Sequence, residues 1–548
     1  MSMSQPTTSA GPDDTKASWL PLMVVMLCQI QISFNAFNVS IKGITTDLGI
    51  PASSVGLALT TGTFAMAGFI LLGAKLGARF GVRRALQIGT VIPMLAAATI
   101  AVAQNGTMLF VAQAMSGASV ALAAPALTVL IARSYHGKQQ AQAIGFLASA
   151  IPLAQVVSLL IAGSFASSIG WRWSFALLAA IGALNFAMSW LLDPIPPQDD
   201  VVIDWRGAAL SSSAVILISC GFSFLNAWGL IRATPDAPFS VAGLSPVPIL
   251  LIGGLVFAQA FFKWTRRRMD AGEPVLFSLD VLRSADERSV VACMATMLFV
   301  GTAASFLLPL YMQVVQGFSG IKTSLSIIPY TMSIFIANTL VVRLYDRFNP
   351  RQIARVGFVV VAGALTLLAF TIRNDWHQVV VVIGLVALGL AQGCIVALVF
   401  NVLLSSVPKK LAGDVGAWRG LTHNISGSAG IAVGTALAVS LLGGIVMRDA
   451  IASPAISQEL THQVNFDNVD FITNGQLKDA LATTSATPAE IDAAVDLYED
   501  ARVRALRTTM MVLALLALLG IVPAGRMPDF RTEELTVEDF EGVSVGDP

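Results

Sequence analysis

Polar side chains inside long apolar runs are the residues of this sequence whose types and spacing could do chemistry. Gln31, Asn35 and Asn38 follow one another at intervals of four and three residues, which places them on one face of a helix. An amide both donates and accepts hydrogen bonds, and three amides on one face favour a polar or hydrated environment within a membrane. The stripe therefore predicts part of a site for a small neutral, zwitterionic or cationic molecule.

Four more amides lie singly in other apolar runs and are candidates for the same substrate cavity: Gln113, Gln155, Asn338 and Gln392. Tyr330 lies eight residues before Asn338 in the same run. A second interpretation is that these groups only join helices, since an interhelical hydrogen bond contributes ~0.6 kcal/mol on average. Both interpretations stay open from the sequence.

Arg419 and His423 are the charged and titratable residues nearest the interior of an apolar run. They are four residues apart and so share a helix face. Arg419 could contact an anionic group of a substrate, and His423 could couple protons because the ordinary pKa of histidine is about 6.5. Alternatively, Arg419 extends to lipid headgroups and His423 only packs, since Asp414 precedes Arg419 by five residues.

Enzymatic chemistry has no support in this sequence. It contains no nucleophile–base pair, metal-ligand cluster or phosphate-binding loop, so we expect neither an enzyme nor a cofactor. The four cysteines all lie in apolar runs without metal-ligand spacing. Lys and Arg number 33, as do Asp and Glu, so the net charge does not predict a nucleic-acid partner.

The elements that position these residues are membrane helices. Hydrophobic residues make up 55% of the chain and charged ones only 12%, whereas soluble domains carry about 25% charged residues. About fourteen apolar runs have the roughly 20 residues that cross a bilayer. We expect an all-α integral membrane protein, a monomer, in the lipid bilayer of a plasma membrane (the bacterial inner membrane).

Basic residues gather in every second loop. They follow the second, eighth and tenth apolar runs: Lys75, Arg79, Arg83 and Arg84; Lys263, Arg266, Arg267 and Arg268; Arg343, Arg347, Arg351 and Arg355. Loops rich in Lys and Arg stay in the cytoplasm. This alternation predicts that both termini are cytoplasmic.

Two of these loops repeat one another. The segment 75–83 is similar to 343–351, which lies 268 positions later, and halves repeated in this way rock about a central site in many secondary transporters. Arg79, Arg83, Asp346 and Arg347 are candidates for a conformational gate, because an acid flanked by arginines can bridge to a neighbouring helix end. A solvated surface acid is the alternative for Asp346.

Five motifs resemble a known family in their order and spacing: Leu76…Arg79-Phe80-Gly81…Arg83-Arg84, Trp171-Arg172-Trp173…Phe175, Asp204-Trp205…Gly207, Leu308-Pro309-Leu310-Tyr311…Gln313…Gln316-Gly317 and Asn424…Gly427…Gly430. Over nearly its whole length, the chain resembles the fourteen-helix drug:proton antiporter branch of the major facilitator superfamily. The resemblance implies the major facilitator fold, with two six-helix bundles plus two extra helices. It also implies drug efflux coupled to protons.

Several positions depart from the pattern of that family. Ser33, Ala78, Gln113 and His423 stand where the family carries an Asp, an Asp, an Arg and an Arg. Moreover, none of the predicted membrane spans contains Asp or Glu. The usual acid that exchanges a proton against a drug is therefore not visible, so proton antiport rests on the resemblance alone.

The expected organisation of the chain follows from these runs and loops. A polar tail (1–17) precedes a six-helix bundle (18–195), two extra helices (204–264) and a cytoplasmic linker (265–288). The C-terminal bundle supplies five helices (289–446), an extracytoplasmic loop with a short amphipathic helix (447–505), a last helix (506–525) and an acidic tail (526–548). The amphipathic helix is predicted from the capping box Thr487-Pro488-Ala489-Glu490.

Three functions are compatible with these features. The leading hypothesis is a secondary active transporter of small, mainly lipophilic molecules that works by alternating access. An uncoupled or anion-handling facilitator is the second hypothesis, because the acids are missing. The third is a membrane scaffold that does not transport and uses its outer loop to bind partners.

Overall fold

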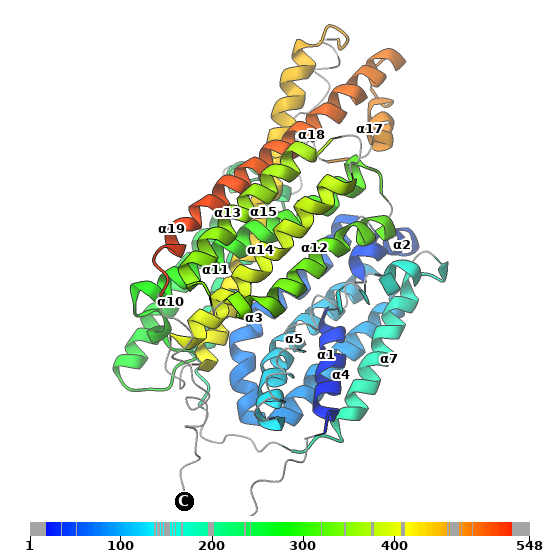
Figure 1. Ribbon diagram of the computed structural model, residues 1–548. Helices are drawn as coiled ribbons and strands as arrows, with labels where there is room; N and C mark the ends of the chain where they lie inside the picture. Colours follow the sequence, from blue (N-terminus) through cyan, green and yellow to red (C-terminus); the bar gives the residue numbers. More distant parts are fainter. Residues whose placement is uncertain are drawn as a thin grey trace, which may run out of the picture.

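The computed structural model describes most of the chain. The described residues are 18–33, 36–50, 52–135, 139, 143, 146, 154–155, 157–158, 160–165, 168–194, 202–234, 237–241, 243–318, 320–344, 347–373, 378–406, 412–457, 460, 471–472, 474–484 and 486–528. Almost all of them are helical, and two isolated bridges near 232–244 are the only β pairing within these ranges. The predicted all-α architecture is confirmed (Figure 1).

The N-terminal half is a bundle of helices around two apolar cores. Its elements are α1 (Leu20–Ser33), α2 (Phe37–Leu48), α3 (Ala52–Phe80), α4 (Val82–Ala101), α5 (Gly106–Ser134), helical residues within 139–168, and α7 (Trp171–Ser189). One core includes Leu86 and Leu127, and the other includes Ile100 and Phe175. Trp171, whose motif begins α7, is 3% exposed and donates its indole N–H to Asp47 over 2.9 Å.

Two helices separate the halves in sequence. They are α8 (Trp205–Ser223), which short α9 (Leu225–Trp228) follows, and α10 (Pro246–Asp270). The Asp204 carboxylate caps α8 by accepting from the Gly207 amide over 2.9 Å and also accepts from the Trp264 indole of α10. A Cβ at Gly207 would lie 2.2 Å from Asp204 Oδ2. The motif Asp204-Trp205…Gly207 therefore joins the start of α8 to α10.

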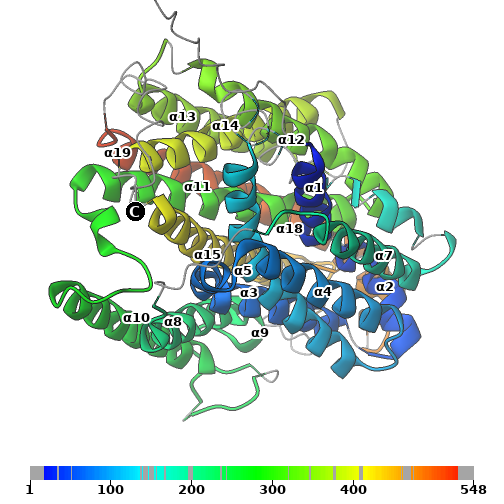
Figure 2. The ribbon, with the colours of Figure 1, turned by 90° about the horizontal axis from the view of Figure 1, so that it is seen from below.

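The C-terminal half contains one large apolar core. Its elements are η1 (Leu279–Leu282), α11 (Ala285–Leu310), η2 (Tyr311–Val315), α12 (Gly320–Leu340), η3 (Val341–Leu344), α13 (Pro350–Thr371), α14 (Gln378–Ser405), α15 (Ala412–Ala452), α17 (Asn474–Leu481), α18 (Pro488–Leu519) and α19 (Ile521–Ala524). Seen along the bundle, α15 lies between the helices of the two halves (Figure 2).

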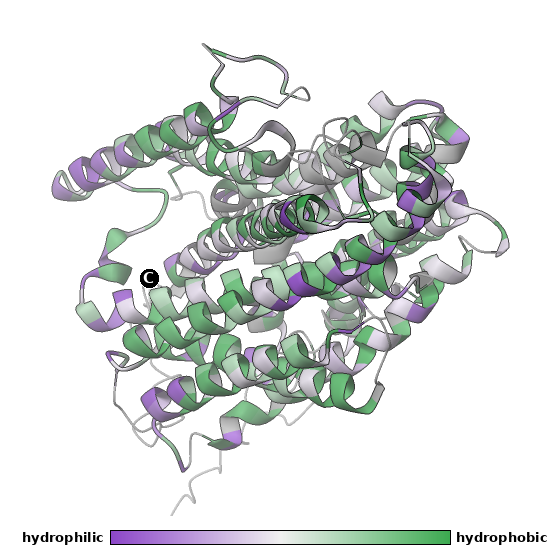
Figure 3. Cartoon of the chain, turned by 90° about the horizontal axis from the view of Figure 1, so that it is seen from above, coloured by the Kyte–Doolittle hydropathy of each residue, from purple (hydrophilic) through white to green (hydrophobic). Residues whose placement is uncertain are grey.

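The helices are consistent with about fourteen membrane crossings. Nine helices in the described ranges are long and apolar enough to cross a bilayer. The pair α1–α2, α3, the helical residues within 139–168, α7 and α12 complete the set. Hydrophobic residues predominate along the helices (Figure 3), and many large ones are exposed, such as Ile252 and Leu255 on α10. Such a surface suits lipid as its solvent.

Glycines allow α3 and α5 to pack backbone against backbone. A Cβ at Gly117 of α5 would lie 1.9 Å from the carbonyl oxygen of Gly62, and a Cβ at Gly73 of α3 would lie 2.1 Å from that of Ala121. Real Cβ atoms do not approach so closely. Membrane helices that lack a hydrophobic driving force between them associate through such close contacts.

The helices α15 and α18 are longer than a membrane span. They contain 41 and 32 residues, whereas about 20 cross the hydrocarbon. The amphipathic helix expected within 447–505 and the last helix expected at 506–525 are one continuous helix, because no Gly or Pro interrupts the chain between Pro488 and Gly520. Parts of α15 and α18 project together with α17 beyond the other helices (Figure 1).

A buried arginine attaches this projecting segment to the C-terminal half. Arg502 is 2% exposed. Its guanidinium donates to the carbonyls of Val314 (3.3 Å) and Ile472 (2.9 Å) and to the side chain of Asn474 (2.6 Å). The Asn474 amide in turn donates to the Glu499 carboxylate. The groups that accept from the guanidinium are therefore neutral and come from two segments, one at Val314 and one at 472–474.

The capping box predicted at the start of α18 is confirmed. The Thr487 hydroxyl accepts from the Glu490 amide, and the Glu490 carboxylate accepts from the Thr487 amide over 2.8 Å and from the Ser457 amide over 3.1 Å. Hydrogen bonds to this carboxylate from the Ser457 side chain, the Thr487 amide and the Thr487 hydroxyl, in decreasing order of effect, lower the pKa of Glu490 from 4.5 to about 2.

Acid should loosen the contact between Ser457 and α18. Because the pKa of Glu490 is lowered in the folded state, its contribution to stability is present above about pH 4.5 and is lost as the pH falls towards about 2. A spin label at Ala455 should become more mobile across this window in the parent. Glu490→Gln preserves the capping geometry without titrating, so its label should show no such change. Equal pH dependence in both proteins would contradict the assignment.

Candidate functional site

A polar network crosses three helices inside the C-terminal half. The hydroxyl of Tyr330 on α12 donates to Gln392 Oε1 on α14 over 2.6 Å, and it lies 2.9 Å from the Ser305 hydroxyl on α11. Tyr330 is buried, whereas Ser305 is exposed on its helix. The network therefore reaches the surface of the half through Ser305.

Gly301 makes room for this network. A Cβ at Gly301 would lie 2.7 Å from Gln392 Nε2, so a larger residue on α11 would push the amide away from Tyr330. At the next residue of α11, the Thr302 hydroxyl lies 3.1 Å from the Gly427 carbonyl of α15. Gly430 allows that approach, because a Cβ there would lie 2.5 Å from Thr302 Oγ1.

Two further polar residues, Arg419 and His423, lie on α15 before Gly427. Both side chains are exposed, and the Arg419 guanidinium lies over the Phe400 ring of α14, 4.4 Å from its centroid. Arg419 precedes Gly427 by eight residues, about 12 Å along the helix at 1.5 Å per residue. We call these residues the polar track: Ser305, Tyr330, Gln392, Thr302, His423 and Arg419.

Removing the Tyr330 hydroxyl should destabilise the C-terminal half. In Tyr330→Phe, the part-buried Gln392 carbonyl loses its donor. An unsatisfied group that is fully buried costs about 1–3 kcal/mol, so we expect a loss towards the lower end of this range. The melting temperature of the purified protein measures this loss. Ser326→Ala is the matched control, because the Ser326 hydroxyl bonds only the Lys322 carbonyl of its own helix. An unchanged melting temperature in Tyr330→Phe would show that the network contributes little.

The structure places the predicted cavity amides in different parts of the molecule. Gln31 is 4% exposed inside the N-terminal half, and its amide donates to the Thr90 carbonyl over 3.1 Å. Gln113 lies beside Gly62 of α3, and Gln155 is exposed. The C-terminal half brings together Gln392 with Tyr330, while Asn338 on α12 has a buried Oδ1 without a hydrogen-bond partner among the described residues.

The structure does not describe the side chains of two members of the predicted amide stripe. Asn35 lies outside the described residues, and Asn38 belongs to α2, of which the position but not the side chain is described. Because α1 ends at Ser33 and α2 begins at Phe37, the stripe does not run along one uninterrupted helix. Gln31 packs against α4 and α7, so its geometry favours a role in joining helices.

One of the predicted gate residues, Arg83, makes a contact that Arg351 repeats in the other half. Arg83, at the start of α4, donates to the Trp190 carbonyl just after α7 over 2.7 Å. Arg351, at the start of α13, donates in the same way to the Met527 carbonyl after α19. These arginines are 268 positions apart, the spacing of the sequence repeat, so the contacts support that repeat. Arg79 and Arg347 are exposed, and Asp346 lies outside the described residues.

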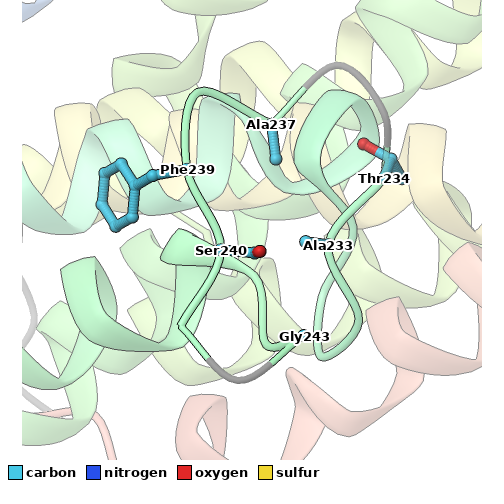
Figure 4. A pocket seen from close by; sticks show the side chains of 6 residues that line it. All are labelled: Ala233, Thr234, Ala237, Phe239, Ser240 and Gly243. Carbon is cyan, nitrogen blue, oxygen red and sulfur yellow. The ribbon is translucent and has the colours of Figure 1, made fainter.

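Hollows in the described surface lie away from the polar track. One of about 510 Å³ is lined by loop residues between α9 and α10, including Thr234, Phe239 and Ser240 (Figure 4). Another of about 300 Å³ lies on α13 and α14 beside Val356, Leu390 and Cys394 and is almost entirely apolar. Neither contains the Arg419 or Tyr330 side chain.

A multi-pass helical protein with polar side chains inside its membrane region has the features of a membrane transporter. The sequence profile of the Major Facilitator Superfamily matches residues 23–431, and the chain belongs to this family. It is a transporter and not an enzyme, and it handles small-molecule substrates within a membrane.

The individual relatives share about a quarter of their residues with this chain. The chain is 26% identical over 454 residues to the probable actinorhodin transporter of Streptomyces coelicolor, covering 80% of this chain and 75% of that protein. It is 23% identical over 429 residues to the tetracenomycin C resistance and export protein of Streptomyces glaucescens, covering 78% and 77%. The structure of the peptide transporter POT in complex with sulfate shares the fold, with a TM-score of 0.59, 14% identity and coverage of 93% and 95%.

Sequence reasoning missed Ser305 and Thr302 as parts of the site. Serine and threonine are common in membrane helices, and both of these hydroxyls also bond carbonyls of their own helix, so their types and spacing give no signal. The aromatic ring of Phe400 likewise looks like any apolar residue of α14. Only the three-dimensional contacts identify these positions.

Proposed function

We propose that the protein is a secondary transporter that exports small, mainly lipophilic, drug-like molecules by alternating access. Relatives named as transporters or resistance and export proteins for actinorhodin, tetracenomycin C and puromycin support this substrate class. Its location is the plasma membrane, with both termini in the cytoplasm, as the basic loops indicate. The protein acts as a monomer.

The observation that carries the proposal is the polar track. Hydroxyl and amide groups of α11, α12 and α14 form one hydrogen-bonded network. Thr302 of α11 contacts Gly427 of α15, and α15, which lies between the two halves (Figure 2), also carries the exposed Arg419 and His423. Polar groups within a membrane are costly and line substrate pathways more often than lipid-facing surfaces. Substrate contacts at such a place can alternate between the two sides when the halves rock.

Proton coupling in this protein cannot use a carboxylate inside a span, because the predicted spans contain no Asp or Glu. We therefore propose that exchange of substrate across the membrane does not require a pH gradient. His423 is the residue of the polar track that could add a proton dependence.

Counterflow in proteoliposomes tests this function. Liposomes loaded with an unlabelled aromatic compound should accumulate its labelled form without a pH gradient, whereas empty liposomes should not. If accumulation instead requires an imposed pH gradient, and if His423→Gln abolishes the effect of that gradient, the protein is a proton antiporter and not an uncoupled exchanger. Binding without movement of any compound tested would favour the scaffold hypothesis and overturn the proposal.

A further inference from the structure

We infer that Arg419 and Phe400 form a subsite for an aromatic carboxylate, the anionic end of a flat, otherwise apolar substrate. The inference rests on the proposed function, because it names the chemical class that the same polar track would bind. Its central observation is a guanidinium that lies over an aromatic ring, 4.4 Å from the ring centroid, on a side chain that is exposed.

Arg419 has no anionic partner in the described part of the chain. None of the ion pairs there includes it, and the Phe400 ring is the contact that fixes it. A guanidinium carries five N–H donors in a plane. Among the described residues these donors make no hydrogen bond, so they are available to a ligand.

The nearest acid on the same helix is engaged elsewhere. Asp414 lies beside the backbone of Ser278 and near the charge of Lys75 on α3. The neighbouring Trp418 is buried against the same segment, where its indole N–H lies 3.3 Å from the Ser278 carbonyl and its ring contacts Phe277. This side of α15 is occupied, whereas Arg419 points to the α14 side.

The chemistry of this pair selects a planar anion. A carboxylate accepts two parallel hydrogen bonds from a guanidinium edge, and an aromatic ring attached to it can pack beside Phe400 and the apolar surface around it. His423, four residues deeper along α15, can donate a further hydrogen bond. A cation would be repelled by Arg419, and a neutral compound would gain no charge-assisted bond.

Binding of 2-naphthoate and of its uncharged analogue 2-naphthamide tests the subsite directly. The two probes have nearly the same shape, so their difference reports the charge. The purified full-length protein in phosphatidylcholine nanodiscs should bind naphthoate at least tenfold more tightly than naphthamide. Arg419→Gln should lose this tenfold preference, Arg419→Lys should retain part of it, and Phe400→Leu should weaken both probes several-fold.

Controls separate the subsite from folding, lipid and transport. Arg448→Gln removes an exposed arginine on the projecting end of α15 and should leave the preference unchanged, and melting curves show whether each variant is folded. If Arg419→Gln retains the preference in a folded protein, or if the parent has none, the inference is wrong. It is also wrong if phosphatidylglycerol in the nanodisc displaces naphthoate, because Arg419 then binds lipid phosphate.

The same variants distinguish this inference from the proposed function. Counterflow of naphthoate that is independent of Arg419 would leave transport standing and refute the subsite. Arg419-dependent binding without counterflow of any compound would leave the subsite standing and refute transport.

Discussion

Gly117→Ala should prevent the N-terminal half from packing, with the largest loss of folded protein among Gly→Ala changes at the described glycines. The added Cβ would lie 1.9 Å from the Gly62 carbonyl oxygen and 2.7 Å from the Gly62 carbonyl carbon. Both are backbone atoms, so α3 and α5 must separate to accommodate it. Overpacking of a core usually costs about 1–3 kcal/mol and sometimes more, and here the contact is between two helix backbones.

The yield of monodisperse protein in detergent and its melting temperature measure this effect. Gly363→Ala is the matched control, because a Cβ at Gly363 of α13 meets nothing within 4 Å. That variant makes the same chemical change within a membrane helix and should behave like the parent. A Gly117→Ala protein that melts like Gly363→Ala would show that α3 and α5 are not in close contact.

Arg502→Ala should release the projecting segment from the C-terminal half. The substitution leaves two carbonyls, those of Val314 and Ile472, and the Asn474 side chain without their donor. Each unsatisfied buried group costs about 1–3 kcal/mol, and the lost side chain leaves a void among buried residues. We expect a loss of at least about 3 kcal/mol in the stability of this region.

Limited proteolysis of 447–505 in intact proteoliposomes reports this release, together with the melting temperature. Arg504→Ala is the control, because Arg504 pairs with Asp449 at a partly exposed position, and such pairs contribute about 0–1 kcal/mol. Proteolysis should be much faster in Arg502→Ala than in Arg504→Ala. Equal rates would mean that the buried arginine does not anchor the segment.

The sequence was sufficient for the architecture because lipid imposes strong local rules. Apolar runs of about 20 residues predict helices without knowledge of their neighbours. The repeat between 75–83 and 343–351 predicted related halves, and the matching contacts of Arg83 and Arg351 agree with it. These features depend on local composition and on spacing along the chain, both of which a sequence records.

The site was less accessible from the sequence because its contacts join distant segments. Gln31 was predicted to belong to a substrate-facing stripe, but it packs inside the N-terminal half. The sequence could not show this, because a helix that is apolar on all sides does not reveal which side faces the space between the two halves. Arg502 looked like a loop residue near the start of a span. Its acceptors lie up to 188 positions away, and nothing near it in sequence indicates their presence.

The anchoring of the projecting segment has a consequence for observing the transport cycle. Arg502 and its hydrogen-bond acceptors belong to the C-terminal half of the molecule. The outer parts of α15, α17 and α18 should therefore move together with that half, and we call them the handle. A fluorophore on α17, paired with another on the outer end of α7, would convert each reorientation into a change in energy transfer outside the bilayer. An antibody fragment raised against this handle offers a means of trapping a single state from the aqueous side.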